Sequence, residues 1–234
     1  MAYRSSGWLL RLSVEPPSPH PSRQNFPSSP PDFTVDSTDI RDEWAERSGE
    51  YSPAYYAYYG ADETSELVQS ILAEHVEEDA AVLEVGCSSG RHLAALAEAG
   101  YSDLTGVDIN GDALDVLAET YPDLAATGSF HAIAIEEFVT DVADDTYDVV
   151  FSVETLQHLH PDVDWAFEEL ARIVDDLLIT VENEGGDPGE VNYVDDNVPL
   201  YYRDWNAVFT DCGLTEVDSI DGKRDTVRIF QVPE

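Results

Sequence analysis

The segment VLEVGCSSGRHL, residues 82–93, constrains the fold of this 234-residue chain more than any other stretch. An apolar run typical of a buried strand leads to Glu84, and a turn with Gly86 and Gly90 opens a helical pattern. Glycines permit a tight turn and let a ligand approach the backbone. A strand, turn and helix in this order predict a binding site at the carboxyl end of the first strand of an open α/β sheet.

The rest of the chain continues the alternation of strands and helices. Strands are predicted at residues 80–84, 104–108, 129–134, 147–153 and 176–181, and helices at 89–99, 112–120, 162–174 and 204–212. Two last strands, 214–220 and 226–232, flank Asp221-Gly222, a favoured hairpin dipeptide. The pattern predicts an α/β fold: a Rossmann-like, doubly wound, mostly parallel seven-stranded sheet with helices on both faces and an antiparallel C-terminal hairpin.

The region before the sheet has two parts. Residues 1–35 carry seven of the thirteen prolines and are predicted to be disordered. A secretory signal is the alternative, but Arg11 cuts the short apolar stretch that begins at Trp8. Residues 36–79 are predicted to form two helices: one capped by Asp36, and one after Asp62 with its buried face at Leu67, Ile71, Leu72 and Val76. The main domain is expected at residues 80–234.

The charge balance limits the possible partners. The chain has 49 acidic and 11 basic residues, which gives a net charge of −38. This charge disfavours nucleic acid as a partner. Adaptation to high salt, where the screening length falls to ~3 Å, is the preferred explanation, and an acidic surface for a basic partner is the alternative. No apolar run approaches the ~18 residues of a membrane helix. Two cysteines, Cys87 and Cys212, exclude a disulfide scaffold and favour a reducing, cytoplasmic location.

The glycine-rich turn does not fit a phosphate-binding loop. Its register departs from G-x-G-x-x-G, and no Gly-Lys-Ser/Thr ending follows. Glu84 would repel a pyrophosphate but attract an ammonium group. Asp108, at the end of the next strand, is suited to the two hydroxyls of a ribose. A cofactor with an amino-acid cation and an adenosine, but no phosphate, fits these residues best.

These segments together resemble the class I S-adenosylmethionine-dependent methyltransferases. The family's glycine loop is matched by residues 84–90, its second motif by residues 106–110, its fourth strand by residues 147–152 and the following segment by residues 153–159. The resemblance implies S-adenosylmethionine as cofactor, no metal, and contacts from Glu84, Gly86, Cys87, Ser88, Gly90, Asp108, Ile109 and Ser152. Ser88 replaces a glycine of the family, which is tolerated if that position does not need a positive φ.

The region expected to contact the adenine of the cofactor departs from the family pattern. The family often places an acid after the third strand to meet the adenine amino group, whereas this chain has Ala134 there. The backbone of Ala134 and Ile135 is expected to contact the adenine instead, with Glu136 as the alternative. Residues 36–79 are expected to form a helical lid, with Arg47 reaching the cofactor carboxylate. Its aromatic wall would be Trp44, Tyr51, Tyr55 and Tyr56, unless these residues only pack the added helix.

On the acceptor side, His158 is the preferred general base, with Glu154 and His160 as alternatives. Tyr193, Tyr201, Tyr202 and Arg203 are expected to close the acceptor pocket, and residues 187–197 to form a mobile loop. The predicted function is methyl transfer to an oxygen, nitrogen or carbon atom of a small molecule, by a monomer or homodimer. The alternatives are a non-catalytic relative that binds the cofactor as a sensor or partner subunit, and another Rossmann-type nucleotide-binding enzyme.

Overall fold

The computed structural model describes residues 36–194, 198–222 and 224–233, so the disorder predicted for residues 1–35 lies outside its scope. Three helices precede the sheet: α1 (Ser37–Ala45), α2 (Pro53–Tyr59) and α3 (Glu63–His75). The caps explain their starts. Asp36 and Asp62 each accept backbone N–H groups in a capping box, and α2 begins with Pro53 and ends at Gly60, where φ is 67°.

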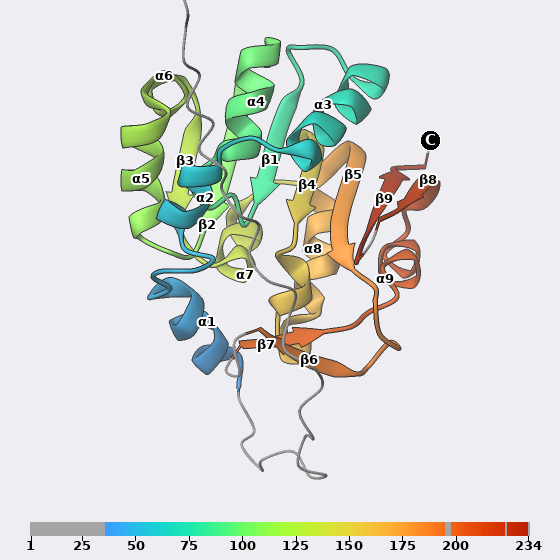
Figure 1. Cartoon of the computed structure of the whole chain (residues 1–234). Helices are drawn as coiled ribbons and strands as arrows, with labels where there is room; N and C mark the ends of the chain where they lie inside the picture. The colour runs from blue at the N-terminus through green and yellow to red at the C-terminus, as the bar shows by residue number, and fades with distance from the viewer. Residues whose placement is uncertain (1–35, 195–197, 223, 234) are drawn as a thin grey trace, which may run out of the picture. The chain divides into compact units, whose positions relative to one another are not determined.

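The main sheet has seven strands in the order β3-β2-β1-β4-β5-β9-β8 (Figure 1). Neighbours among β1 to β5 are parallel, whereas β9 runs antiparallel to both β5 and β8. The strands are β1 (Ala81–Val85), β2 (Asp103–Asp108), β3 (Ser129–Ala132), β4 (Tyr147–Val153), β5 (Val174–Asn183), β8 (Thr215–Asp221) and β9 (Asp225–Gln231). The predicted fold class, including the C-terminal hairpin, is confirmed.

Six further α-helices connect the strands: α4 (Arg91–Ala99), α5 (Asp112–Thr120), α6 (Pro122–Thr127), α7 (Ile135–Phe138), α8 (Trp165–Ile173) and α9 (Trp205–Asp211). Short 3-10 turns lie at η1 (Val139–Asp141), η2 (Leu156–His158) and η3 (Pro161–Val163). The sequence patterns predicted α4, α5, α8 and α9 but neither α6 nor α7. None of the helices in the described part of the chain is long and apolar enough to cross a membrane.

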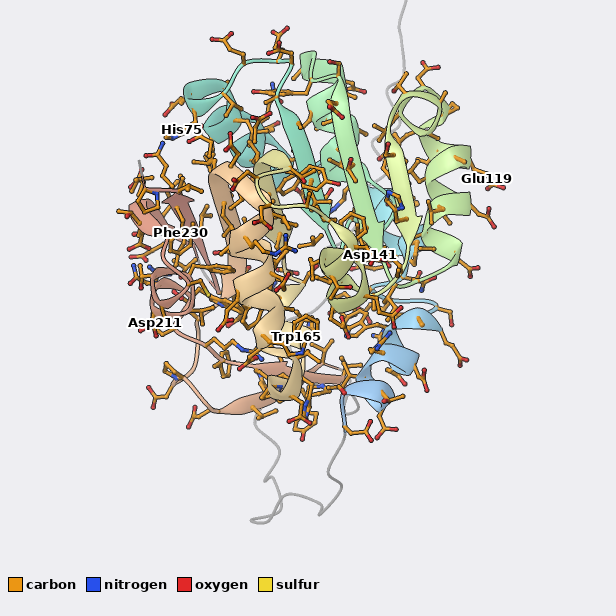
Figure 2. The ribbon with its side chains drawn as sticks, turned by 180° about the vertical axis from the view of Figure 1, so that it is seen from behind. His75, Glu119, Asp141, Trp165, Asp211 and Phe230 are labelled. Carbon is orange, nitrogen blue, oxygen red and sulfur yellow. The ribbon has the colours of Figure 1, made fainter. Side chains whose placement is uncertain are left out.

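Two apolar layers cover the sheet. Side chains of α3, α4 and α6 pack on one face, on alternate strand residues such as Val82 and Val149. Side chains of α7, α8 and α9 pack on the other, against Leu83 and Val150. Seen from behind, α8 with Trp165 and α9 with Asp211 lie in front of the sheet (Figure 2). Helix α3 therefore belongs to the core, and of the predicted lid only the segment with α1 and α2 lies outside it.

A second, two-stranded sheet was not expected from the sequence. Strands β6 (Val191–Val194) and β7 (Val198–Tyr201) pair antiparallel. The pairing continues past β6, because the N–H of Tyr202 donates to the Glu190 carbonyl at 3.0 Å. The prediction of a mobile loop over residues 187–197 is thus wrong at residues 191–194, and residues 195–197 lie outside the described part. The glycines and the proline at residues 185–189 favour a loop in the sequence pattern, but they form only the turn that precedes β6.

Candidate active site

A cleft opens at the carboxyl ends of β1, β2 and β4, whose arrowheads in Figure 1 point to the end of the sheet where α1, β6 and β7 lie. It holds about 1020 Å³ of empty space, open solvent included. Most residues predicted to contact the cofactor line it: Arg47, Glu84, Gly86, Cys87, Ser88, Asp108, Ile109, Ala134 and Ile135. His158 lines it too, whereas Gly90 and Ser152 do not.

The glycine-rich loop turns tightly over the end of β2. The N–H groups of Gly86 and Cys87 both donate to the Val107 carbonyl, at 2.7 and 2.9 Å. Gly86 has a φ of 74°, and a Cβ there would lie 2.7 Å from the Thr155 Cβ. Ser88 also has a positive φ, 48°, so the condition under which serine would be tolerated is not met. A left-handed non-glycine residue costs ~1–2 kcal/mol, which must be offset by its contacts.

Asp108 supplies the compensating contact for Ser88. Its Oδ2 accepts the Ser88 N–H and its Oδ1 accepts the Asn110 N–H, both at 2.8 Å. Burial raises the pKa of the Asp108 carboxyl, while these two bonds oppose the rise. Each oxygen keeps a further lone pair for a ligand hydroxyl. The carboxylate is therefore held in one orientation at the wall of the cleft.

Glu84 presents an unsatisfied buried oxygen. The residue is 1% exposed and lines the cleft, and its Oε2 has no hydrogen-bond partner among the described residues. Burial raises the pKa of Glu84 well above its usual range, and the guanidinium of Arg91 opposes this rise. A buried carboxylate oxygen without a partner is costly, so a cation or N–H donor from a ligand would relieve the cost.

Residues 36–59, here termed the N-terminal cover, form one wall of the cleft with Ile40, Arg41, Trp44, Arg47, Tyr51, Pro53 and Tyr56. The Asn110 side-chain amide donates to the Trp44 and Arg47 carbonyls at 3.2 and 3.0 Å and so ties α1 to the loop after β2. The Arg47 Nε donates to the Glu50 carbonyl at 3.0 Å. Tyr55, expected in this wall, does not line the cleft, and its ring packs against those of Tyr51, Tyr56 and Tyr59.

After β3, Ala134 caps α7 and Ile135 begins it, and both residues are buried. Glu136, the alternative adenine partner, also lines the cleft and pairs with Arg41 of α1 at 3.5 Å. Arg41 also pairs with the neighbouring Glu137. The N-terminal cover is thus fastened to α7 by an ionic contact as well as to the β2 loop by Asn110.

Two residues that were predicted to contact the cofactor, Gly90 and Ser152, lie outside the cleft lining. A Cβ on Gly90 would lie 2.6 Å from Leu117 Cδ1, so this glycine allows α4 to pack against α5. The Ser152 hydroxyl donates to Glu182 at 2.6 Å in the interior. Both residues follow the family motif in sequence but face away from the cleft lining.

The imidazole of His158 is buried at the cleft wall. Its Nδ1 lies 3.0 Å from the Pro199 carbonyl and its Nε2 lies 3.4 Å from the Gln157 amide nitrogen. The Trp44 ring packs on it with centroids 4.8 Å apart. Burial lowers the pKa of His158 to about 4, and the charges of Arg47 and Arg203 contribute. The imidazole is therefore neutral at physiological pH.

The alternative bases differ in position. Glu154 lines the cleft, pairs with Arg224 at 3.2 Å and has a φ of 47°. Its pKa is raised, by burial first and then by Asp225. His160 lies outside the cleft lining, where its ring contacts Tyr201.

The predicted acceptor wall is also displaced. The cleft lining does not include Tyr193, Tyr201, Tyr202 or Arg203; Tyr193 and Tyr201 belong to the paired strands β6 and β7. Arg203 instead donates to the Leu159 carbonyl at 2.7 Å and braces the turn after β4.

Several cleft residues have no recognisable sequence signal: Arg41, Asn110 and His92. The His92 Nδ1 lies 2.8 Å from the Ser65 hydroxyl of α3, and burial, then Arg91, lowers the pKa of His92 to about 3. In the sequence, His92 lies two residues after Gly90, and this position indicates only that it belongs to the helix. Asn110 is the last residue of the second motif, but the motif does not indicate its contact with the N-terminal cover, which joins segments far apart in sequence.

Comparison with known proteins assigns the central part of the chain. Residues 82–176 match the family model described as a methyltransferase domain. The ubiquinone biosynthesis O-methyltransferase of Actinobacillus pleuropneumoniae is 33% identical over 81 residues, 33% of this chain and 34% of that protein. An O-methyltransferase of Pyrenophora dematioidea is 25% identical over 93 residues, 40% of this chain and 34% of that protein. The chain thus aligns with about a third of the length of these curated relatives.

Solved structures extend the fold similarity to most of the chain. The 1,6-didemethyltoxoflavin-N1-methyltransferase of Burkholderia thailandensis, crystallised with its substrate and S-adenosylhomocysteine, has a TM-score of 0.63 at 18% identity, covering 85% of this chain and 87% of that one. The magnesium protoporphyrin IX methyltransferase of Synechocystis, with bound S-adenosylmethionine, has a TM-score of 0.62 at 16% identity, covering 84% and 97%. Residues 82–176 thus match a methyltransferase domain, and the fold of the chain is similar to that of solved methyltransferases that bind S-adenosylmethionine or S-adenosylhomocysteine.

Proposed function

We propose that this protein binds S-adenosylmethionine in the cleft and transfers its methyl group to a hydroxyl of a small-molecule acceptor. The observation that carries the proposal is the pair of carboxylates at the ends of β1 and β2. Glu84 has an oxygen without a partner, which fits the ammonium of the cofactor's amino-acid part. Asp108 is oriented by two N–H bonds, which fits the ribose hydroxyls. The buried backbone at Ala134 and Ile135 would border the adenine.

The cofactor, when bound, supplies a methyl group already activated on a sulfonium. The residues of the cleft then have to hold the acceptor in line with that methyl group and keep water out. Trp44 and Ile40 offer an apolar wall on the N-terminal cover. The buried Trp44 Nε1 has no hydrogen-bond partner among the described residues and is a donor available to a ligand oxygen. A planar, oxygen-bearing acceptor fits this wall.

A hydroxyl acceptor must lose a proton as its oxygen is methylated. His158 is the proposed proton acceptor, because its Nδ1–H is committed to the Pro199 carbonyl and leaves the lone pair on Nε2. The low pKa of His158 makes it a weak base, so an acidic hydroxyl such as a phenol or enol suits it better than an alcohol. The relatives named as O-methyltransferases support the choice of a hydroxyl acceptor.

The test has a binding arm and a transfer arm. Calorimetric titration with S-adenosylhomocysteine in concentrated KCl should give micromolar binding. S-adenosylmethionine is then incubated with phenols, catechols, alcohols and amines, and release of S-adenosylhomocysteine is measured. Turnover with a phenol or catechol that falls at least tenfold in His158→Gln, with cofactor affinity kept, supports the proposal. Cofactor binding with turnover of amines alone would contradict the hydroxyl acceptor. Absence of cofactor binding by folded protein would refute the function as a whole.

A further inference from the structure

The turn that carries His158 is built around Glu182, a residue of β5 that is fully buried and does not line the cleft. Its carboxylate accepts four hydrogen bonds of 2.6 to 3.2 Å, from the Ser152 hydroxyl and from the N–H groups of Thr155, Leu156 and Gln157. The carboxylate therefore fixes the backbone of the turn just before His158.

Gln157 is the residue that joins this buried carboxylate to the imidazole. Its Oε1 accepts the Asn183 N–H at 2.7 Å, which identifies the other end of the amide as the NH2 group. That NH2 lies 3.4 Å from His158 Nε2. On the other side of the ring, the Pro199 carbonyl can only accept, so the proton is on Nδ1. Gln157 thus directs an N–H at the lone pair that the proposed reaction uses.

We propose that Gln157 is a positioning residue, a substitute donor that keeps the lone pair on His158 Nε2 until the hydroxyl of the methyl acceptor replaces it. The inference rests on the proposed function and names the residue that prepares the base. The 3.4 Å separation exceeds the usual ~2.7–3.2 Å of an N–H hydrogen bond, so a hydroxyl at normal distance can displace the amide.

The proton balance follows from this exchange. The acceptor oxygen forms its bond to the methyl carbon as the carbon–sulfur bond breaks, and the sulfonium becomes a neutral thioether. The proton of the hydroxyl passes to Nε2, giving an imidazolium that later releases the proton to solvent. The fixed positive charges that act on the ring come from Arg47, just after α1, and from Arg203, after β7, and they favour that release.

The decisive variant is Gln157→Glu in the full chain. It keeps an acceptor for the Asn183 N–H but places a carboxylate oxygen opposite Nε2 instead of a donor. The His158 pKa should then rise by at least one unit, because the carboxylate stabilises a proton on Nε2. The readout is the pH dependence of imidazole nitrogen shifts in long-range proton–nitrogen NMR spectra. The His158 signals are assigned by their loss in His158→Gln.

Two further variants control the experiment. Gln69→Glu makes the same chemical change on α3, outside the cleft lining, and should leave the His158 titration unchanged. Gln157→Met removes the donor without adding charge, and should let a fraction of His158 carry its proton on Nε2. If Gln157→Glu fails to fold, as judged by thermal melting, Gln157→Met decides the result.

The outcomes separate the two proposals. A shifted His158 titration in Gln157→Glu, or the second tautomer in Gln157→Met, supports the positioning role. Wild-type nitrogen shifts and titration in every Gln157 variant that folds overturn it. Titration of S-adenosylhomocysteine into the same samples tests the underlying function independently. If the cofactor product binds and the spectra do not change, only the role of Gln157 is lost. If it does not bind to the wild-type chain, the proposed function itself fails.

Discussion

Replacing Asp108 with asparagine tests the cofactor site with almost no change in side-chain size. Both carboxylate oxygens accept an N–H at 2.8 Å, one from Asn110 and one from Ser88. Either orientation of an amide therefore points its NH2 at another donor, and the strained Ser88 loses part of its restraint. The variant also lacks the charge that strengthens hydrogen bonds to ribose hydroxyls. We expect a loss of about 1–3 kcal/mol in cofactor binding, about 5- to 150-fold in Kd.

The assay is calorimetric titration of S-adenosylhomocysteine into wild-type protein, Asp108→Asn and a matched control. Asp115→Asn removes the same charge from an exposed position on α5, outside the cleft lining, and should bind like the wild type. Thermal melting establishes that each variant is folded. A Kd for Asp108→Asn within twofold of the wild-type value would refute the assignment of Asp108 to the ribose.

Three other perturbations have definite expected signs. Gly86→Ala should lower the free energy of unfolding by about 2 kcal/mol or more and abolish cofactor binding. The reason is that a Cβ at a φ of 74° would overlap the Thr155 side chain. An unchanged midpoint of urea unfolding would contradict this prediction. Burial raises the pKa of Glu182 from 4.5 to about 7, so its stabilising contribution is complete below pH 4.5 and is lost as the pH rises through about 7. Urea unfolding between about pH 5 and pH 8 should therefore show the wild type losing up to about 3 kcal/mol relative to Glu182→Gln, and parallel curves would show that Glu182 does not titrate there. We also propose that the charge of −38 reflects adaptation to high salt: the melting temperature should rise between about 0.1 and 2 M KCl, as the screening length falls from ~10 Å to below ~3 Å, and equal temperatures would exclude this explanation.

The strands of the main sheet and most of its helices could be predicted because each of them is marked locally by its own apolar pattern. The elements that were missed depend on something else. Helix α6 begins at Pro122, which the pattern treats only as the end of the preceding helix, although proline is also favoured in a first turn. Strand β6 is exposed and follows a glycine-rich turn, so its identity comes from pairing with β7 rather than from its residues.

The same distinction applies to the candidate site: some of its residues could be predicted from local patterns, and others depend on contacts between distant segments. Glu84 and Asp108 were recognisable because they end neighbouring parallel strands, and topology alone brings them to one cleft. The φ of Ser88 could not be foreseen, since serine disfavours the left-handed region and is held there by a contact with Asp108. The positions of Gln157 and Ser152 depend on Glu182, at least 25 residues further along the chain. Such contacts leave no periodic trace in a single sequence.

The attachment of the N-terminal cover has a kinetic consequence. Asn110 holds two carbonyls of this segment from a position two residues beyond Asp108, and Arg41 holds its far side to α7. A spent cofactor bound at Asp108, as we propose, would border the segment that these contacts hold in place. We expect the departure of S-adenosylhomocysteine, rather than the transfer of the methyl group, to limit the turnover rate. If product release limits the rate, a variant that weakens the attachment of α1 should turn over faster although it binds the cofactor less tightly.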